Sequence, residues 1–425
     1  MLDGDSPGVT KASVPPEKFG TRILDMVHRL AQWSERSDGL MCTFFSPAHK
    51  AVAAQLREWM RSAGLGVEID AVGNVIGRYA SAAKSAKTLI VGSHYDTVAN
   101  AGRFDGRLGI VTALVVAEHL LRTEQRLPFH LEVIGFSEEE GVRFSTPYLG
   151  SSAVAGRFDE TAMRRCDESG VSLAAILQEE SVDLAAIQAL ARRPGGLRGY
   201  VEVHIEQGPV LLQRLLPVGV VTSIAGSARF RITIHGVAGH AGTVPMELRH
   251  DAAAAAAEIV LAVEQRCSSA TTLVGTVGQL AVPRGLINVI PGCCELSLDV
   301  RAGDDATRDT AIADILAAIE RITERRAVTA VVTEIGRHAA VACSPTLQSA
   351  LAQAIARAGV EPFHLASGAG HDATVFMGVT EIGMLFVRCG NGGISHSPLE
   401  TITAEDADIA ARVLLDFLVN LDARR

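Results

Sequence analysis

Imidazole and carboxylate side chains gather in a few short stretches of this sequence. Three consecutive glutamates, at 138–140, follow an apolar run that begins at Phe129, and His94 follows another apolar run upstream. Imidazoles and carboxylates are common ligands of divalent ions in hydrolases, and a further carboxylate can carry a proton. These residue types therefore indicate a two-metal hydrolase. The remaining ligand candidates are Asp105, His204 and His396.

The predicted strands explain how these side chains could meet. Short apolar runs alternate with helical patterns from residue 88 onward, which indicates an α/β domain. In open α/β sheets, ligands bind beyond the carboxyl ends of the strands. His94 and Glu138 each follow such an end, so we expect them to share one crevice. The apolar runs are 88–92, 129–136 and 200–205, and a helix is predicted from about 106.

Two aspartates accompany the first histidine. Asp96 lies two residues after His94 and could hold the second imidazole nitrogen, as metal-binding histidines require. Gly106 permits a tight turn that would bring Asp105 over the same crevice, where its carboxylate could bridge two ions. Singly, a strand histidine is more often a core residue, and a run of glutamates is usually a solvated surface. Three such clusters at strand ends favour the metal site.

A different pattern occupies the middle of the chain, with the order strand, helix, strand, strand, helix, strand. This is the split βαββαβ arrangement of ferredoxin-like domains. We therefore predict an inserted domain at 222–335 within a discontinuous domain formed by 1–221 and 336–425. The predicted elements are strand 228–236, helix 245–265, strands 272–281 and 288–300, helix 305–325 and strand 328–334, followed by helix 345–358, strand 380–387 and helix 404–420.

Composition limits the classes of protein to consider. The chain has 425 residues and a formal charge of -9, without a basic run, which argues against a nucleic-acid partner. The first residues lack the basic and apolar regions of a signal peptide, and Glu258 interrupts the longest apolar stretch, so we expect no membrane span. The seven scattered cysteines favour a reducing cytoplasm. Residues 1–16 are predicted to be a loose tail, followed by helices at 18–34 and 47–63.

Eight segments, taken in order, resemble one family. It is the amidase, hydantoinase and carbamoylase branch of the di-zinc aminoacylase and carboxypeptidase superfamily, whose members hydrolyse ureido compounds. The resemblance runs from about 19 to 420. It implies an α/β/α catalytic domain of the di-metal exopeptidase type, with the inserted domain serving as a lid and in dimerisation. The segments are 92–98, 104–106, 138–144, 204–209, 239–246, 288–292, 367–373 and 393–398.

The same resemblance implies two divalent ions, Zn²⁺ or Mn²⁺, that share the carboxylate of Asp105. His94 and His204 would complete one site. Glu140 and His396 would complete the other.

A catalytic pair accompanies these ligands in the resemblance. Glu139 would stay unligated as the general base, and Asp96 would support catalysis by holding the neighbouring imidazole. His204 is typical of this branch, because aminopeptidase and carboxypeptidase relatives generally have a carboxylate there. Val142 is a departure, since many members carry serine at that position.

The implied substrate-binding residues are spread over both domains. Arg301 offers a planar fork to a carboxylate, although an arginine at a strand end is usually a surface ion pair. His240 could donate to a developing oxyanion or reach across a dimer into the partner's site, but it could equally stabilise its own loop. The implied set further contains Asn288, Gln207 and Gly370, with His371 and Asp372 as supporting candidates.

The implied reaction is hydrolysis of the ureido C–N bond of allantoate or an N-carbamoyl-L-amino acid, with release of ammonia and carbon dioxide, by a cytoplasmic homodimer. A peptidase or aminoacylase on the same scaffold is the first alternative, opposed by His204 and by the presence of Asn288 and Arg301. A catalytically inactive binding protein is the second, opposed by the complete ligand set. The segments 243–246 and 103–105 favour bacterial allantoate amidohydrolases over β-ureidopropionases.

Overall fold

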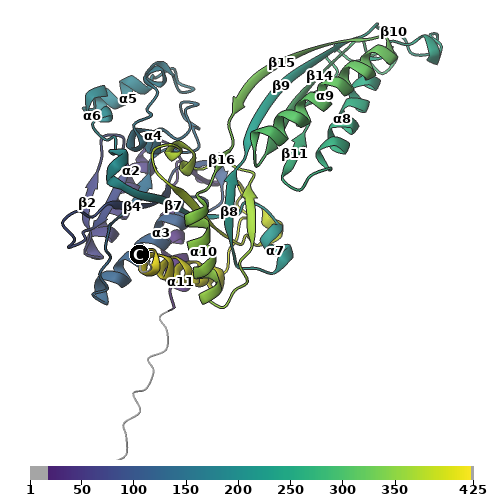
Figure 1. Ribbon diagram of the computed structural model, residues 1–425. Coiled ribbons are helices and arrows are strands. Elements are labelled where there is room, and N and C mark those ends of the chain that lie inside the picture. The colour runs from purple at the N-terminus through teal and green to yellow at the C-terminus, as the bar shows by residue number, and fades with distance from the viewer. Residues whose placement is uncertain (1–17, 423–425) are drawn as a thin grey trace, which may run out of the picture.

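The computed structural model describes residues 18–422, and the predicted tail at 1–16 lies outside this range. Figure 1 shows a larger body that contains both ends of the described chain and a smaller, elongated body formed by its middle. Long strands connect the two bodies. Among the described residues, no helix combines the length and the apolar character that a membrane crossing requires.

A nine-stranded sheet is the centre of the larger body. Its order is β16-β8-β18-β7-β4-β6-β3-β2, with β17 beside β8. The four strands β18, β7, β4 and β6 are mutually parallel, so their carboxyl ends share one edge. The bounds are β2 Gly66–Ile69, β3 Val75–Tyr79, β4 Thr88–His94, β6 His130–Phe136, β7 Leu197–Ile205, β8 Val218–Ile224, β16 Val341–Ala342, β17 His364–Ser367 and β18 Ile382–Val387.

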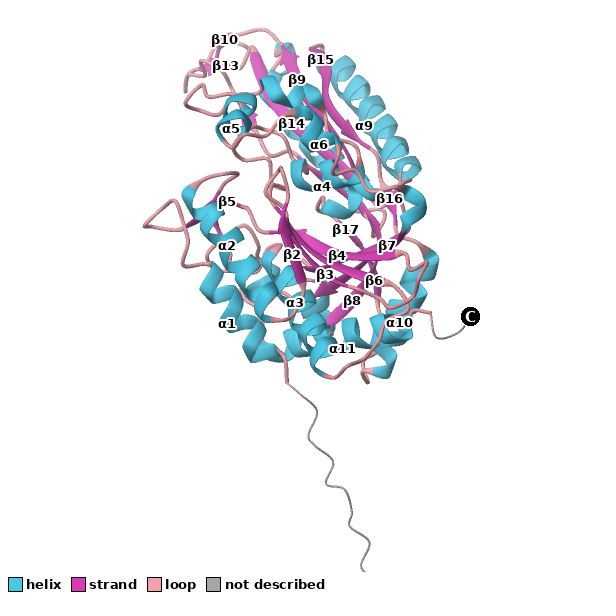
Figure 2. Ribbon diagram, turned by 90° about the vertical axis from the view of Figure 1, so that its left-hand side faces the viewer, coloured by secondary structure: helices cyan, strands magenta, loops and turns pink. Residues whose placement is uncertain are grey.

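Helices cover both faces of this sheet (Figure 2). Successive strand residues alternate between the faces, so Leu89 and Val91 enter one apolar core and Ile90 enters the other. Burial on both sides explains the continuous apolar runs of the sequence and confirms the predicted α/β/α architecture. One face packs on α1 Gly20–Leu30, α2 Pro47–Ser62, α3 Arg107–Arg122, α10 Pro345–Arg357 and α11 Ala404–Asn420, and the other on α4 Leu149–Ala155 and the 3-10 helix Asp372–Phe376.

A helical segment between β6 and β7 packs in a separate apolar cluster, where Phe144 and Leu173 of the segment join Phe44. It begins directly after the three glutamates, and the backbone N–H of Tyr148 in this segment donates a hydrogen bond to the carbonyl oxygen of Glu139. Its helices after α4 are α5 Leu173–Glu179 and α6 Leu184–Gln188. The larger body also contains β1 Leu40–Cys42, which pairs with β5 Thr97–Ala101, and the short helix α7 Val210–Arg214.

The smaller body is an antiparallel sheet in the order β11-β14-β9-β15, with β12 beside β14. Two helices cover one of its faces (Figure 1). Among its four main strands, β11, β14, β9 and β15, the order second, third, first, fourth is that of the split βαββαβ unit. The bounds are β9 Gly226–His235, β10 Gly239–His240, α8 Ala252–Cys267, β11 Leu273–Thr276, β12 Leu280–Ala281, β13 Val289–Ile290, β14 Cys293–Ala302, α9 Asp305–Arg326 and β15 Thr329–His338.

Several predicted bounds in this body were wrong. The helix expected at 245–265 begins at Ala252, because the carboxylate of Asp251 accepts hydrogen bonds from the first free backbone N–H groups and caps the helix there. The strand expected at 288–300 is divided after Ile290 by Pro291, which has no N–H for the ladder. Likewise, the strand expected at 272–281 is divided into β11 and β12.

Candidate metal centre

The carboxyl edge of the parallel strands brings the predicted ligands together. His94 is the last residue of β4 and lies opposite Phe136, the last residue of β6. The glutamates at 138–140 therefore emerge beside it. His204, one residue before the end of β7, lies opposite Phe386 of β18. Strands that are far apart in the sequence thus present imidazoles and carboxylates at one edge.

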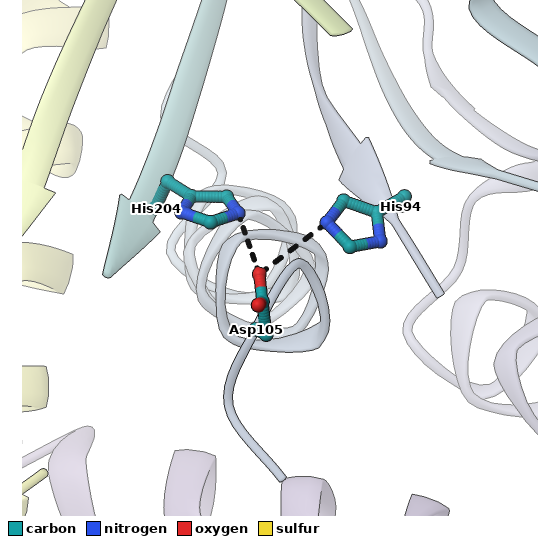
Figure 3. A group of neighbouring side chains, drawn as sticks. All are labelled: His94, Asp105 and His204. Atoms are coloured by element: carbon teal, nitrogen blue, oxygen red, sulfur yellow. Dashed lines mark ion pairs between the residues drawn. The ribbon is translucent and has the colours of Figure 1, made fainter. Parts of the chain in front are cut away.

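Asp105 lies at the centre of this cluster. Its Oδ1 is 3.1 Å from His204 Nε2 and 3.5 Å from His94 Nε2 (Figure 3). Its Oδ2 is 3.1 Å from His396 Nε2. The turn that follows Asp105 needs glycine, because Gly106 has a φ of 65° and a Cβ there would lie 2.4 Å from the carbonyl oxygen of His94. One carboxylate therefore faces three imidazoles.

Two groups of donor atoms share Asp105, and the atoms within each group lie within 4.8 Å of one another. The first group contains His94, Asp105 and His204, and the second contains Asp105, Glu140 and His396. His396 Nε2 also lies 3.5 Å from Glu140 Oε1. Glu139 and Glu140 form another such group with His94, and a fourth group contains Glu202, His204 and His371. Two adjacent ion positions that share a carboxylate fit this arrangement.

The shifted pKa values in the cluster also indicate a site for cations. Burial, reinforced by the charge of Asp105, raises the pKa of Glu140 to about 7, and burial raises that of Glu139 well above its ordinary value. Burial opposes ionisation of Asp105 as well, but hydrogen bonds from His204, His396 and His94 hold its pKa well below the ordinary value. The hydrogen bond to Asp105 raises the pKa of His396 to about 9. Divalent cations would relieve the repulsion among these carboxylates, so the donor set fits metal ions.

Asp96 holds both the first histidine and the glutamate segment. Its Oδ1 accepts a hydrogen bond from the backbone N–H of Glu139 at 3.0 Å, and its Oδ2 accepts one from Glu140 at 3.1 Å. His94 Nδ1 lies 3.3 Å from the same carboxylate, which turns Nε2 of that ring toward Asp105. A single buried carboxylate thus orients residues from two strands.

Two of the predicted substrate residues adjoin the cluster. Gln207 Nε2 donates a hydrogen bond to Asp105 Oδ2 at 2.9 Å. Gly370 lies under Tyr148, and a Cβ at that position would be 2.0 Å from the tyrosine hydroxyl oxygen. Gln207 also lines a cleft of about 930 Å³ between the two bodies, together with Arg301 and His396.

The structure separates the other predicted substrate residues. Arg301 lies in β14 near the larger body and pairs with Ser227, whereas His240 pairs with Val289 at the far tip of the smaller body (Figure 1). Extended strand from 293 to 301 alone spans roughly 26 Å. His240 and the neighbouring Asn288 are exposed there. Within one chain, His240 and Asn288 therefore lie far from Arg301 and do not reach the cluster.

The supporting candidates lie behind the ligands. His371 is buried, its Nε2 is 2.8 Å from Ser367 Oγ, and its ring centre is 4.5 Å from that of His204. Burial, reinforced by the charge of His204, lowers the pKa of His371 well below its ordinary value. Asp372 is buried beside it, and burial raises the pKa of this carboxyl. Both residues therefore border the first donor group.

Sequence reasoning missed Glu400. Its Oε1 accepts hydrogen bonds from the backbone N–H groups of Phe104 at 2.7 Å and Asp105 at 3.2 Å, while Ser395 Oγ donates to its Oε2 at 2.8 Å. Ser395 Oγ also lies 3.2 Å from Asp105 Oδ2, so its single proton is shared between the two carboxylates. Glu400 therefore fixes the loop that carries the shared carboxylate. It follows the 393–398 segment by two residues, and nothing in that spacing indicates this contact.

Comparison with known proteins assigns the chain to a family. Allantoate deiminase 2 of Glycine max is 41% identical, over 96% of this chain and 90% of that protein. An N-carbamoyl-L-amino acid amidohydrolase of Geobacillus stearothermophilus is 39% identical, over 93% of this chain and 97% of that protein. The crystal structure of an amidase of the hydantoinase/carbamoylase family from Burkholderia multivorans has a TM-score of 0.88 and 31% identity, covering 95% of this chain and 97% of that one. The model of peptidase family M20/M25/M40 matches residues 90–420, and the chain belongs to this family.

Proposed function

We propose that this protein is a two-metal amidohydrolase that cleaves the carbamoyl C–N bond of a ureido acid. The substrate is allantoate or an N-carbamoyl-L-amino acid, and the products are ammonia, carbon dioxide and an amine. The relatives described above support this class of substrate. The observation that carries the proposal is that Arg301, a carboxylate-binding side chain, lines the same cleft as the imidazole of His396.

Two Zn²⁺ or Mn²⁺ ions would share Asp105. His94 and His204 would hold one ion, and Glu140 and His396 the other, in agreement with the two donor groups. Bound there, the ions would polarise the ureido carbonyl and lower the pKa of water. Asp96 and Glu400 would keep the ligands in place through the hydrogen bonds already described.

Glu139 is the proton carrier in this proposal. It is buried in the cluster, and its backbone is anchored by Asp96. Burial raises its pKa well above the ordinary value, which suits a carboxylate that accepts a proton from water and passes it to the leaving nitrogen. The flanking Glu140 would remain a ligand.

Substrate recognition would involve both bodies. Arg301 would bind the carboxylate of the substrate, with Gln207 and Gly370 beside the reacting group. We propose that 222–335 form a lid and dimerisation domain, and that His240 and Asn288 enter the cleft of a second copy. Exposed apolar side chains around them, Met246, Leu286 and Ile287, support an interface at this tip. All seven cysteines are free, which supports a location in the reducing cytoplasm.

Ammonia release tests this proposal. The Mn²⁺-loaded protein would be incubated with allantoate, several N-carbamoyl-L-amino acids, N-carbamoyl-β-alanine and a dipeptide. Release of ammonia from a ureido acid is expected, and the best substrate identifies the enzyme. Cleavage of the dipeptide without reaction of any ureido acid would establish a peptidase instead.

A further inference from the structure

The guanidinium of Arg301 has two fixed partners, one from each body. Its Nε and Nη2 donate hydrogen bonds to the two carboxylate oxygens of Asp299, both at 3.0 Å. Its Nη1 donates to the backbone carbonyl of Gly368 at 2.9 Å, in the loop that follows β17. An arginine has five N–H groups. One N–H on each terminal nitrogen is therefore left for another acceptor.

These hydrogen bonds determine which side of the fork can meet a ligand. Asp299 occupies the side formed by Nε and Nη2, so the free hydrogen of Nη2 lies toward Nη1. A carboxylate that enters the cleft can therefore accept hydrogen bonds from the N–H groups that remain on the two terminal nitrogens of Arg301. A planar fork with one fixed side binds a carboxylate in a narrow range of orientations.

Asp299 is itself held in place. Arg229, from the adjacent strand β9, donates from Nε to Asp299 Oδ2 at 3.0 Å. Burial opposes ionisation of Asp299, but hydrogen bonds from Arg301 and Arg229 hold its pKa below the ordinary value. The carboxylate is therefore charged at neutral pH and binds both guanidinium groups. The three side chains together retain one positive charge, which favours an anionic group in the cleft.

We infer that Asp299 is a positioning residue for acid recognition. It fixes the rotamer of Arg301, so that the free terminal nitrogens align the substrate carboxylate while the ureido group lies at the Asp105 cluster. This role depends on the proposed function, because Asp299 acts on a substrate only through Arg301. Its consequence is discrimination: the protein selects ureido acids over neutral ureido amides of the same size.

The test compares the substitution Asp299→Asn with the unmodified protein on two substrates. Asparagine keeps the size of the side chain but loses the charge and one acceptor, so the two-point hold on Arg301 is broken. For an N-carbamoyl-L-amino acid, we expect kcat/KM to fall about tenfold or more, mainly through KM. For the matching N-carbamoyl amino amide, kcat/KM should stay within about twofold.

A matched control is available in the same sheet. Glu334 on β15 accepts hydrogen bonds from Arg337 Nε and Nη2 at 2.9 and 2.8 Å, the same two-point contact on an exposed surface. Glu334→Gln breaks that contact and should leave both substrates unaffected. An equal loss on acid and amide in Asp299→Asn, or no loss on either, would overturn the inference.

Failure of the proposed function gives a separate result. In that case the unmodified protein releases ammonia from no ureido acid. Calorimetric binding of the same acid and amide to the metal-loaded proteins then decides the role of Asp299 without catalysis. Weaker binding of the acid alone in Asp299→Asn supports the inference, whereas equal binding of the acid by both proteins, including no binding by either, overturns it.

Discussion

The carboxylate of Asp96 accepts a hydrogen bond from the backbone N–H of Glu139 at 3.0 Å. These residues follow different strands, β4 and β6, and the bond fixes the glutamate segment against the first histidine. Asp96 therefore sets the position of Glu139, the proposed proton carrier. Asp96 itself belongs to neither of the two donor groups that share Asp105.

Replacing Asp96 should lower metal affinity and activity more than it lowers the free energy of unfolding. Asp96→Asn keeps one acceptor oxygen but places an amide N–H₂ against one of the two backbone donors, Glu139 or Glu140. We expect metal affinity or kcat/KM to fall about 10- to 100-fold, measured by metal titration and ammonia release. Asp304→Asn is the control, since Asp304 accepts a similar bond from the Thr307 N–H at 2.8 Å, remote from the cluster. A variant of Asp96 that matches this control in both measurements would contradict the anchoring role.

Metal removal should reverse the effect of pH on stability. Without metal, the carboxyl of Glu140 has a pKa of about 7 and the imidazole of His396 has one of about 9. Both lie above ordinary unfolded values of about 4.3 and 6.5. The folded chain therefore binds these protons more tightly, and the resulting stability is lost as pH rises through the folded pKa values.

The expected outcome is a lower Tm at pH 8.5 than at pH 5.5 for the chelator-treated protein. Asp105 does not offset this, because its depressed pKa affects stability only in more acidic solution. The metal-loaded protein should show the opposite trend, since protons compete with metal ions for the ligands. Differential scanning calorimetry of both forms measures this, and a rising Tm in the metal-free form would contradict the charge balance described here.

The contact between Gly370 and Tyr148 predicts a rescue. Gly370→Ala places a Cβ 2.0 Å from the tyrosine hydroxyl oxygen, so the ring must move, and Tyr148 adjoins the cluster through its backbone hydrogen bond to Glu139. We expect a loss of about tenfold in kcat/KM, with little change in the free energy of unfolding, because the displaced group is the end of a partly exposed side chain. Adding Tyr148→Phe removes the clashing oxygen and should restore part of the activity. A double variant no better than Gly370→Ala alone would show that the contact is unimportant.

Sequence reasoning succeeded where a strand end determines position. His94 and the glutamates follow parallel strands, and the shared edge of a parallel sheet brings such residues together whatever their separation in the chain. Glu400 could not be found in this way, because its role depends on the return of a loop to the backbone of Asp105 from 295 positions away. Short-range patterns carry no information about such a return.

The separation of Asn288 from Arg301 is a consequence of the predicted strand. The pattern predicts one strand from 288 to 300, and only 13 positions separate the two residues. Extended strand does occupy most of this interval in the structure, in β13 and β14, so the two residues lie far apart in the smaller body. Residues that are close in sequence lie far apart in space when the chain between them is extended.

This separation predicts that His240 acts in a second copy. His240→Ala and Glu139→Gln should each be inactive. Dissociated and reassociated together in equal amounts, they form mixed dimers in which one cleft has both Glu139 and His240. The mixture should recover about one quarter of the unmodified rate, because half of the dimers are mixed and half of their sites are intact. No recovery, in a mixture shown by native mass spectrometry to contain mixed dimers, would mean that His240 does not act across the interface.

Metal content and ammonia release, measured on the same preparations of unmodified protein and Glu139→Gln, test the central claim most directly. The account predicts two divalent ions per chain in both proteins and a rate about 100- to 10,000-fold lower in the variant, because Glu139 moves a proton and holds no metal. Loss of an ion together with activity would make Glu139 a ligand, and an unchanged rate would remove it from the reaction; either result would contradict the account.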